Sequence, residues 1–104
     1  LVNKEIPSMM EIYKIIDIKK KIIPAVVHKD DTCRIQTVKF EDNQFVYRLL
    51  KNFNSKTGVP ILLNTSFNEN EPIVCKPEDA IKTFLRVSMD ALVLENFIIL
   101  RKKA

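Results

Sequence analysis

The stretch "PILLNTSFNENEP", residues 60–72, joins an apolar run to a cluster of neutral polar side chains. Its first part, Ile61–Leu63, has the composition of a short buried strand, and we expect a strand over 59–64. Four hydrogen-bonding side chains lie at the end of that strand: Asn64, Thr65, Ser66 and Asn68. A simple turn needs fewer such groups and usually contains a glycine, which this stretch lacks. The cluster therefore indicates either a turn that bonds to its own backbone or a binding site.

Two amphipathic helices are expected on either side of this stretch. Apolar residues at helical spacing predict a helix over 43–56, with Asp42 as its N-cap and Gly58 as the left-handed residue that ends it. A second helix is predicted over 77–88, because Pro77 suits the first turn of a helix and acidic residues follow it.

Six further segments have the β-branched and aromatic content of strands: 11–16, 22–28, 34–40, 72–74, 91–94 and 97–100. The last two flank Glu95-Asn96, which has the length of a hairpin turn, although glutamate suits a positive φ angle poorly. This order predicts an α+β (mixed α/β) fold, with two helices packed on a mixed, mainly antiparallel sheet. We expect residues 1–104 to form one domain.

The composition is that of an ordinary globular domain, with 46% hydrophobic and 29% charged residues. No apolar run approaches the ~20 residues that span a membrane, and no signal-peptide pattern opens the sequence. Cys33 and Cys75 are therefore expected to be reduced thiols of a cytoplasmic protein. One histidine and two scattered cysteines do not make a zinc site, and we expect no metal site within the chain.

The net charge of +4 suits an anionic ligand, a solvated surface or a nucleic acid. A non-catalytic nucleic-acid binding module is one alternative. It is disfavoured because the aromatic residues follow helix and core periodicity instead of lying between basic residues, as stacking platforms would.

Three stretches carry a family resemblance: "IPAVVHKDDTCRIQTV" (23–38), "TGVPILLNTSFNENEPIVCKPEDAIKTFLR" (57–86) and "MDALVLENFIIL" (89–100). They resemble the C-terminal, YrdC-like domain of the nodulation-type O-carbamoyltransferases, from about Ser8 to the end of the chain. The resemblance implies a YrdC-like half-domain, the C-terminal part of a longer domain whose first half carries further lysine and arginine ligands.

The same resemblance implies an ATP-binding transferase. Its YrdC-like domain is expected to bind carbamoyl phosphate and ATP, with Mg²⁺ accompanying the ATP, and to form carbamoyl adenylate. A separate N-terminal ASKHA-type domain would pass the carbamoyl group to an acceptor hydroxyl. The isolated chain is expected to fold but to be inactive. A second enzyme hypothesis is a relative of the threonylcarbamoyl-adenylate synthases of tRNA modification, which share the YrdC fold. The long "LLNTSFN" and "EPIVCKPEDA" stretches favour the O-carbamoyltransferase.

The carbamoyl group is a small neutral amide, and burying it requires donors and acceptors that match it. Asparagine supplies both, and serine or threonine adds an adaptable hydroxyl. The substrate-binding residues implied at this position are therefore Asn64, Thr65, Ser66 and Asn68. The alternative, an Asx-turn leaving a strand, stays open.

Arg34 matches the motif arginine of the family, and a guanidinium can grip phosphate oxygens in pairs. A surface arginine is the alternative. His28 matches the histidine of the family's "PAVTH" motif; alternatively it bonds to Asp30 or Asp31. Gln36 would share a face with Arg34 on the predicted strand 34–40. No catalytic residue is assigned, because neither cysteine has an identifiable partner base.

The predicted strand directions suggest that Arg34, Asn64 and Ser66 converge on one pocket. If the strands 34–40 and 59–64 are antiparallel neighbours, the start of one lies beside the end of the other. The acidic run Glu69–Glu71 follows this position and would either orient Mg²⁺-bound ATP or form a solvated loop.

Overall fold

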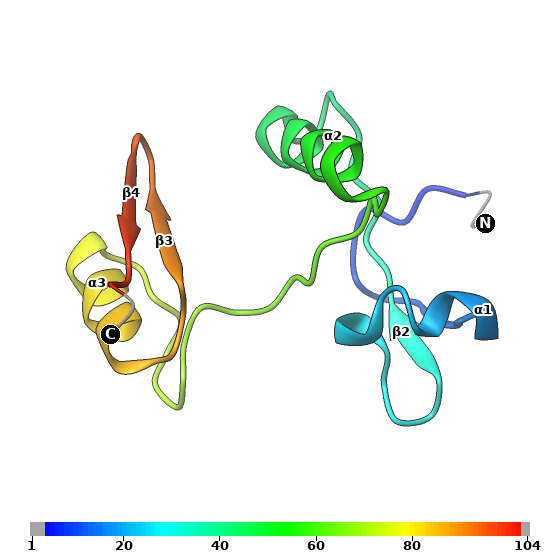
Figure 1. Ribbon diagram of the computed structural model, residues 1–104, viewed down its shortest axis with the longest axis horizontal. Helices are drawn as coiled ribbons and strands as arrows, with labels where there is room; N and C mark the ends of the chain where they lie inside the picture. The colour runs from blue at the N-terminus through cyan, green and yellow to red at the C-terminus, as the bar shows by residue number, and fades with distance from the viewer. Residues whose placement is uncertain (1–3, 103–104) are drawn as a thin grey trace. The chain divides into compact units, whose positions relative to one another are not determined.

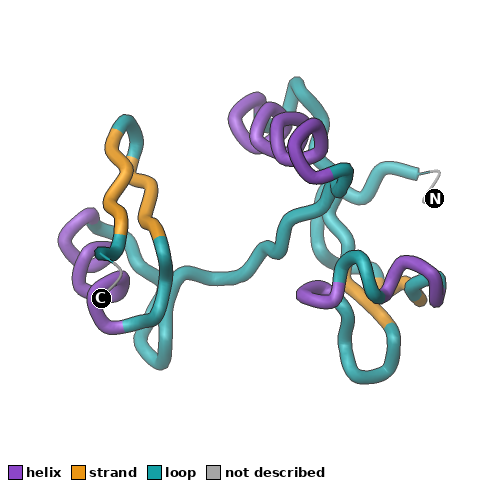
Figure 2. Tube along the Cα trace, viewed as in Figure 1, coloured by secondary structure: helices purple, strands orange, loops and turns teal. Residues whose placement is uncertain are grey.

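The computed structural model describes residues 4–102 and divides the chain into two units, residues 1–63 and 64–104. Each unit is described by itself. Figures 1 and 2 show short helices and strands joined by long loops in both.

The first unit contains β1 (Ile12–Lys14), α1 (Asp17–Lys20), a 3₁₀ turn (Pro24–Val26), β2 (Thr32–Arg34) and α2 (Gln44–Thr57). β1 and β2 form an antiparallel pair in which Tyr13 lies opposite Cys33. Beyond the pair, the Thr37 N–H donates to the Ile6 carbonyl at 2.7 Å, and the Ile6 N–H donates to the Thr37 hydroxyl at 2.7 Å. The buried apolar side chains of this unit are Ile6, Ile15 and Cys33.

Helix α2 begins and ends as helix-capping chemistry requires. Asn43 precedes it in an extended conformation, and its side chain accepts a hydrogen bond from the Val46 N–H at 3.0 Å. Gly58 follows it with φ 75°, which suits glycine because that left-handed region is unfavourable for other residues. The predicted N-cap Asp42 was wrong by one residue, because the extended backbone at Asn43 aims its own side chain at the first free N–H groups.

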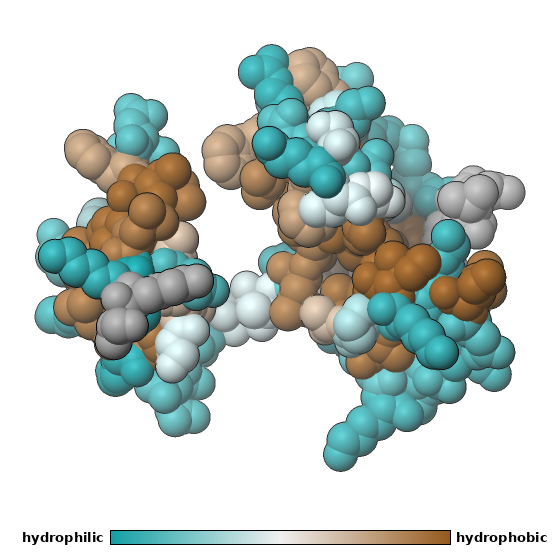
Figure 3. Space-filling model, in the orientation of Figure 1, coloured by the Kyte–Doolittle hydropathy of each residue, from teal (hydrophilic) through white to brown (hydrophobic). Residues whose placement is uncertain are grey.

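None of the side chains of α2 is buried. Its apolar stripe is exposed instead, with relative exposures of 68% at Phe45, 46% at Leu49 and 36% at Phe53. Figure 3 shows hydrophobic side chains at the surface of both units.

The second unit contains α3 (Pro77–Arg86), β3 (Ala91–Leu94) and β4 (Phe97–Leu100). The two strands form an antiparallel hairpin, and Glu95 takes φ 48° in the turn. α3 packs on the hairpin through a small core of Ala80, Phe84 and Leu92. Side chains around this core are partly buried: Phe67, Val74, Leu94 and Ile99.

Arg101, which follows β4, holds the C-terminal end of α3. Its guanidinium donates to the carbonyls of Phe84, Val87 and Met89, with distances of 2.6 Å to Val87 and 2.8 Å to Met89. It also lies over the Phe84 ring, 4.9 Å from the ring centre. A cation at this end of a helix satisfies carbonyls that have no partner within the helix.

The α+β class, both long helices and the hairpin at 91–100 confirm the sequence prediction. Instead of one mixed sheet, the described residues form two separate antiparallel pairs. Three predicted strands are wrong: 59–64 and 72–74 are loops, and 22–28 contains the 3₁₀ turn. Each of these segments holds a proline, which has no N–H to donate to a neighbouring strand.

Two further strands have other bounds than predicted. The segment 11–16 is reduced to Ile12–Lys14, and 34–40 is replaced by Thr32–Arg34, so Arg34 ends a strand instead of beginning one. The run Ile61–Leu63 is not buried, with relative exposures of 41%, 37% and 61% along it.

Candidate functional site

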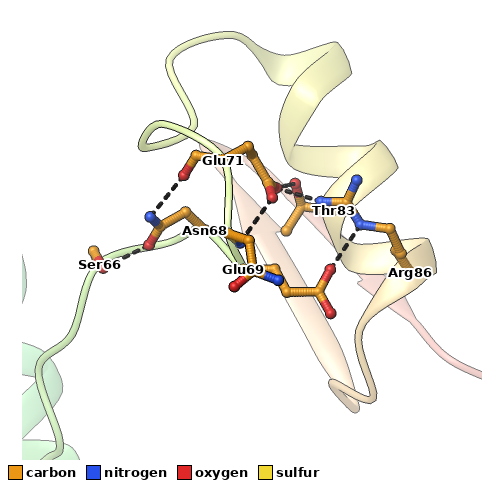
Figure 4. A network of polar contacts seen from close by, with 7 residues as sticks. Ser66, Asn68, Glu69, Glu71, Thr83 and Arg86 are labelled. Atoms are coloured by element: carbon orange, nitrogen blue, oxygen red, sulfur yellow. Dashed lines mark hydrogen bonds and ion pairs between the residues drawn. The ribbon is translucent and has the colours of Figure 1, made fainter.

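The polar side chains that follow Leu63 form a loop over residues 64–72, called the polar loop below. Asn64, Thr65 and Ser66 are exposed, and Asn68 is half-buried. The Ser66 hydroxyl donates to Oδ1 of Asn68 at 2.6 Å, and Nδ2 of Asn68 donates to the Glu71 carbonyl at 2.8 Å (Figure 4).

These two bonds give Asn68 a loop-internal role, in the manner of the alternative that the sequence left open. Both ends of its side-chain amide are used within the loop: the oxygen accepts from Ser66, and the NH₂ group donates to the Glu71 carbonyl. Ser66 differs from Asn68 in what it can still bind, because its hydroxyl oxygen keeps lone pairs that can accept while the hydroxyl donates a hydrogen bond to Asn68. Together with the exposed Thr65 and Asn64, it can present acceptors and an adaptable hydroxyl to a small ligand.

Phe67 fixes the middle of the polar loop. Its side chain packs against the core of α3 and the hairpin, and its carbonyl accepts from the Val74 N–H at 3.0 Å. The polar residues on either side, Ser66 and Asn68, are therefore attached to an anchored apolar residue.

The acidic end of the polar loop is bound to α3 by a group of residues that we call the Arg86 clamp: Arg86, Thr83, Glu69 and Glu71. Glu71 Oε1 accepts from Nη2 of Arg86 and from the Thr83 hydroxyl, the latter at 3.3 Å. Nε of Arg86 lies 3.0 Å from a carboxylate oxygen of Glu69. Figure 4 shows the Arg86 side chain reaching from α3 between the two carboxylates.

Hydrogen bonding and charge both lower the pKa of Glu71 from its ordinary value. The largest cause is a hydrogen bond from its own backbone N–H; the Asn70 N–H, which donates to Oε2 at 3.1 Å, and the Arg86 charge lower it further. Glu71 is therefore a carboxylate at neutral pH, held as an acceptor.

Arg86 was not among the site residues predicted from the sequence. The roles predicted for Glu69–Glu71 were to orient Mg²⁺-bound ATP or to form a solvated loop, whereas both carboxylates of this run pair with Arg86. The available signal was the spacing of Thr83 and Arg86, which places both on one face of a helix. Lys76 and Lys82 are both nearer to Glu71 in sequence than Arg86 is, so that signal could not select the partner.

Arg34 is exposed at the end of β2 and forms no ion pair with any residue of 4–102. Gln36 does not share a strand with it, because β2 ends at Arg34. Instead, Nε2 of Gln36 donates to the Pro7 carbonyl at 3.0 Å. Arg34 is thus accessible to an anion, while Gln36 ties two segments of the first unit together.

His28 is exposed, and its Nδ1 lies 3.1 Å from the Thr32 hydroxyl. That hydroxyl and the Thr32 N–H both bond to Oδ1 of Asp30, at 2.7 and 3.2 Å, and together they lower the pKa of Asp30. The connection from His28 to Asp30 therefore runs through Thr32. Asp31 pairs with Lys20 at 2.6 Å and takes φ 65°, a conformation that glycine adopts more readily.

Arg34 belongs to the first unit, and Asn64 and Ser66 belong to the second. The predicted pairing of strands 34–40 and 59–64 is wrong, because Arg34 ends its strand and 59–64 forms none. Convergence of the three side chains on one ligand stays a prediction.

Both cysteines are free thiols. Burial raises the pKa of Cys33, which keeps it protonated, and Cys75 is exposed with its thiol against the Ile73 carbonyl at 3.2 Å. Within residues 4–102, no three His, Cys, Asp or Glu side chains are grouped to hold a metal ion. None of the helices in that range is long and apolar enough to cross a membrane.

Comparison with known proteins gives several relatives. An uncharacterized protein of Synechocystis sp., sll1178, is 49% identical over 81% of this chain and 14% of its own length. The uncharacterized protein MJ1051 of Methanocaldococcus jannaschii is 43% identical over 93% of the chain and 19% of its own length. Nodulation protein NolNO of Sinorhizobium fredii is 42% identical over 98% of the chain and 15% of its own length. The chain thus spans less than a fifth of each relative.

A family model described as the carbamoyltransferase C-terminus matches residues 1–101. This match covers nearly the whole chain and confirms the family predicted from the three sequence stretches. The chain therefore belongs to the carbamoyltransferase C-terminus family.

Proposed function

We propose that this chain forms part of an O-carbamoyltransferase and helps to bind carbamoyl phosphate and ATP. The observation that carries the proposal is the family match over residues 1–101. The bound substrates, together with one water molecule, would form carbamoyl adenylate. Carbamoyl phosphate would release inorganic phosphate, and ATP would release pyrophosphate. An N-terminal ASKHA-type domain would then transfer the carbamoyl group to an acceptor hydroxyl.

The exposed side chains of the chain suit this chemistry. Arg34, which has no ion pair within the described residues, would bind phosphate oxygens of carbamoyl phosphate or ATP in pairs. Ser66, Thr65 and Asn64 would satisfy the donors and acceptor of the carbamoyl amide. Since no side chain has been assigned as a nucleophile or base, catalysis would come from positioning and charge neutralisation.

Mg²⁺ would enter with ATP as part of the co-substrate. Glu69 and Glu71 do not fit a protein-held magnesium site, because both carboxylates pair with Arg86. The metal would be coordinated by phosphate oxygens, as is common for nucleotide-bound magnesium.

The test is carbamoyl-phosphate-dependent exchange of labelled pyrophosphate into ATP. The 104-residue chain alone should give no exchange, because the family's further ligands lie outside it. The full-length gene product that contains these residues should give exchange that depends on both substrates. Exchange by the 104 residues alone would contradict the division of the site, and no exchange by the full-length product would contradict the proposed reaction.

A further inference from the structure

The polar loop has no strand or helix of its own, although it carries the candidate carbamoyl-binding side chains. Phe67 anchors its middle to the core. The segment after Asn68 has no apolar anchor comparable to Phe67, since Glu69 and Asn70 are exposed and Glu71 is half-buried. Its attachment to α3 is polar and runs through the Arg86 clamp.

The clamp connects to the candidate site through a continuous chain of hydrogen bonds. Arg86 holds the Glu71 side chain, the Glu71 carbonyl accepts from Asn68 Nδ2, and Asn68 Oδ1 accepts from the Ser66 hydroxyl (Figure 4). The orientation of the Ser66 oxygen therefore depends on where Glu71 is held. Thr83, which is only 3% exposed, adds a contact from the buried side of α3.

We propose that Arg86 and Glu71 are positioning residues, which hold the polar loop on α3 so that Ser66, through its bond to Asn68, faces the carbamoyl end of the ligand in a fixed geometry. The identity of that ligand rests on the proposed function. Neither residue of the pair needs to touch the substrate.

The exposure of the Arg86 clamp indicates whether it contributes to global stability or to the order of the polar loop. Arg86 is 52% exposed, Glu69 48% and Glu71 36%, and ion pairs at such positions add little to global stability. A pair of this kind can still determine the order of a loop that has few other attachments. Loss of the clamp should therefore loosen residues 66–71 and leave α3 and the β3–β4 hairpin folded.

The first measurement does not depend on activity. Amide hydrogen exchange is followed in the full-length protein for wild type, Arg86→Gln, Arg86→Lys and Glu71→Gln. Arg86→Gln should speed exchange about tenfold in residues 66–71 and leave the hairpin unchanged. Arg86→Lys keeps the charge but cannot contact both carboxylates through a planar guanidinium. Its exchange rate in residues 66–71 should therefore lie between those of wild type and Arg86→Gln. Lys82→Ala, on the same helix and outside the clamp, is the matched control.

The second measurement separates positioning from general stability. In the pyrophosphate exchange assay, Arg86→Gln should raise the KM for carbamoyl phosphate about 10- to 100-fold, as expected for a misplaced binding group. The KM for ATP should change much less, because the loop is assigned to the carbamoyl end. Glu71→Gln should act in the same direction, and combining it with Arg86→Gln should add little, because the two act as one unit.

Each other outcome has a distinct meaning. If amide hydrogen exchange of residues 66–71 is the same in Arg86→Gln as in wild type, the Arg86 clamp does not hold the polar loop. Faster loop exchange with both KM values unchanged overturns its role in binding and leaves the proposed function standing. Equal rises of both KM values together with faster hairpin exchange would show a purely structural role. Absence of activity in the wild type would overturn the proposed function and, with it, the positioning role.

Discussion

Arg34 and Arg101 are both exposed arginines at the end of a strand, and the structure gives them different surroundings. Arg101 bonds to three main-chain carbonyls and lies over the ring of Phe84. Arg34 has no ion pair within residues 4–102. The first is part of the fold of its unit, and the second is available to an anionic ligand.

Arg34→Ala in the full-length protein should weaken binding of carbamoyl phosphate or ATP by about 2–4 kcal/mol, the size of a lost charged contact. Isothermal titration calorimetry with each ligand measures it. Arg48→Ala, another exposed arginine of the same unit, which lies over Phe40, is the control and should bind both ligands normally. Equal affinity of the Arg34→Ala variant and wild type would remove Arg34 from the site.

Arg101→Ala should lower the free energy of unfolding of the second unit by about 1–3 kcal/mol, because carbonyls at the end of α3 lose their donor. Arg101→Lys should recover only part of it, since one ammonium cannot reach three carbonyls in the same geometry. Urea unfolding followed by circular dichroism compares these variants with Lys102→Ala. An Arg101→Ala midpoint equal to that of Lys102→Ala would show that the contacts add nothing.

At the scale of the elements, local chemistry and tertiary contacts contribute differently to the two long helices. α2 has a cap at each end and no buried side chain. α3 has an N-cap residue, Lys76, without a side-chain bond, but it buries Ala80, Thr83 and Phe84. The first helix depends on its own ends, and the second depends on packing against the hairpin.

Asn43→Ala should therefore destabilise α2 by about 1 kcal/mol, because the Val46 N–H loses its acceptor. Asp42→Ala removes the neighbouring side chain that the sequence nominated as the cap, and it should change stability by no more than about 0.5 kcal/mol. Amide hydrogen exchange in the first turn of α2 distinguishes the two. The reverse order of effects would restore Asp42 as the cap.

At the scale of the whole molecule, few side chains of the described residues are buried. None of them is less than 2% exposed, and large apolar side chains are at the surface of each unit, including Phe45 in α2, Leu85 in α3 and Phe97 in β4. Apolar surface of this extent contributes no stability while it faces water. The sequence predicts a chain that folds by itself. The exposed apolar surface indicates that its free energy of unfolding is small.

The 104-residue chain alone should accordingly bind the dye ANS and unfold at low urea concentration, in a broad transition. Phe97→Lys should reduce dye binding without lowering the urea midpoint, because Phe97 is 72% exposed and supports little of the core. A steep transition without dye binding would show that the units bury this surface in solution.

The sequence by itself determined what depends on neighbours along the chain. The apolar spacing of 43–56, glycine at position 58 and the two apolar runs around Glu95-Asn96 were sufficient to predict α2, its C-terminal end and the hairpin. The three long motifs were sufficient to predict the family. Tertiary structure decided the rest. Whether Ile61–Leu63 becomes a buried strand depends on a pairing partner, and which cation binds Glu71 depends on how the polar loop lies on α3. Such contacts join residues far apart in the chain, and local propensity carries no information about them.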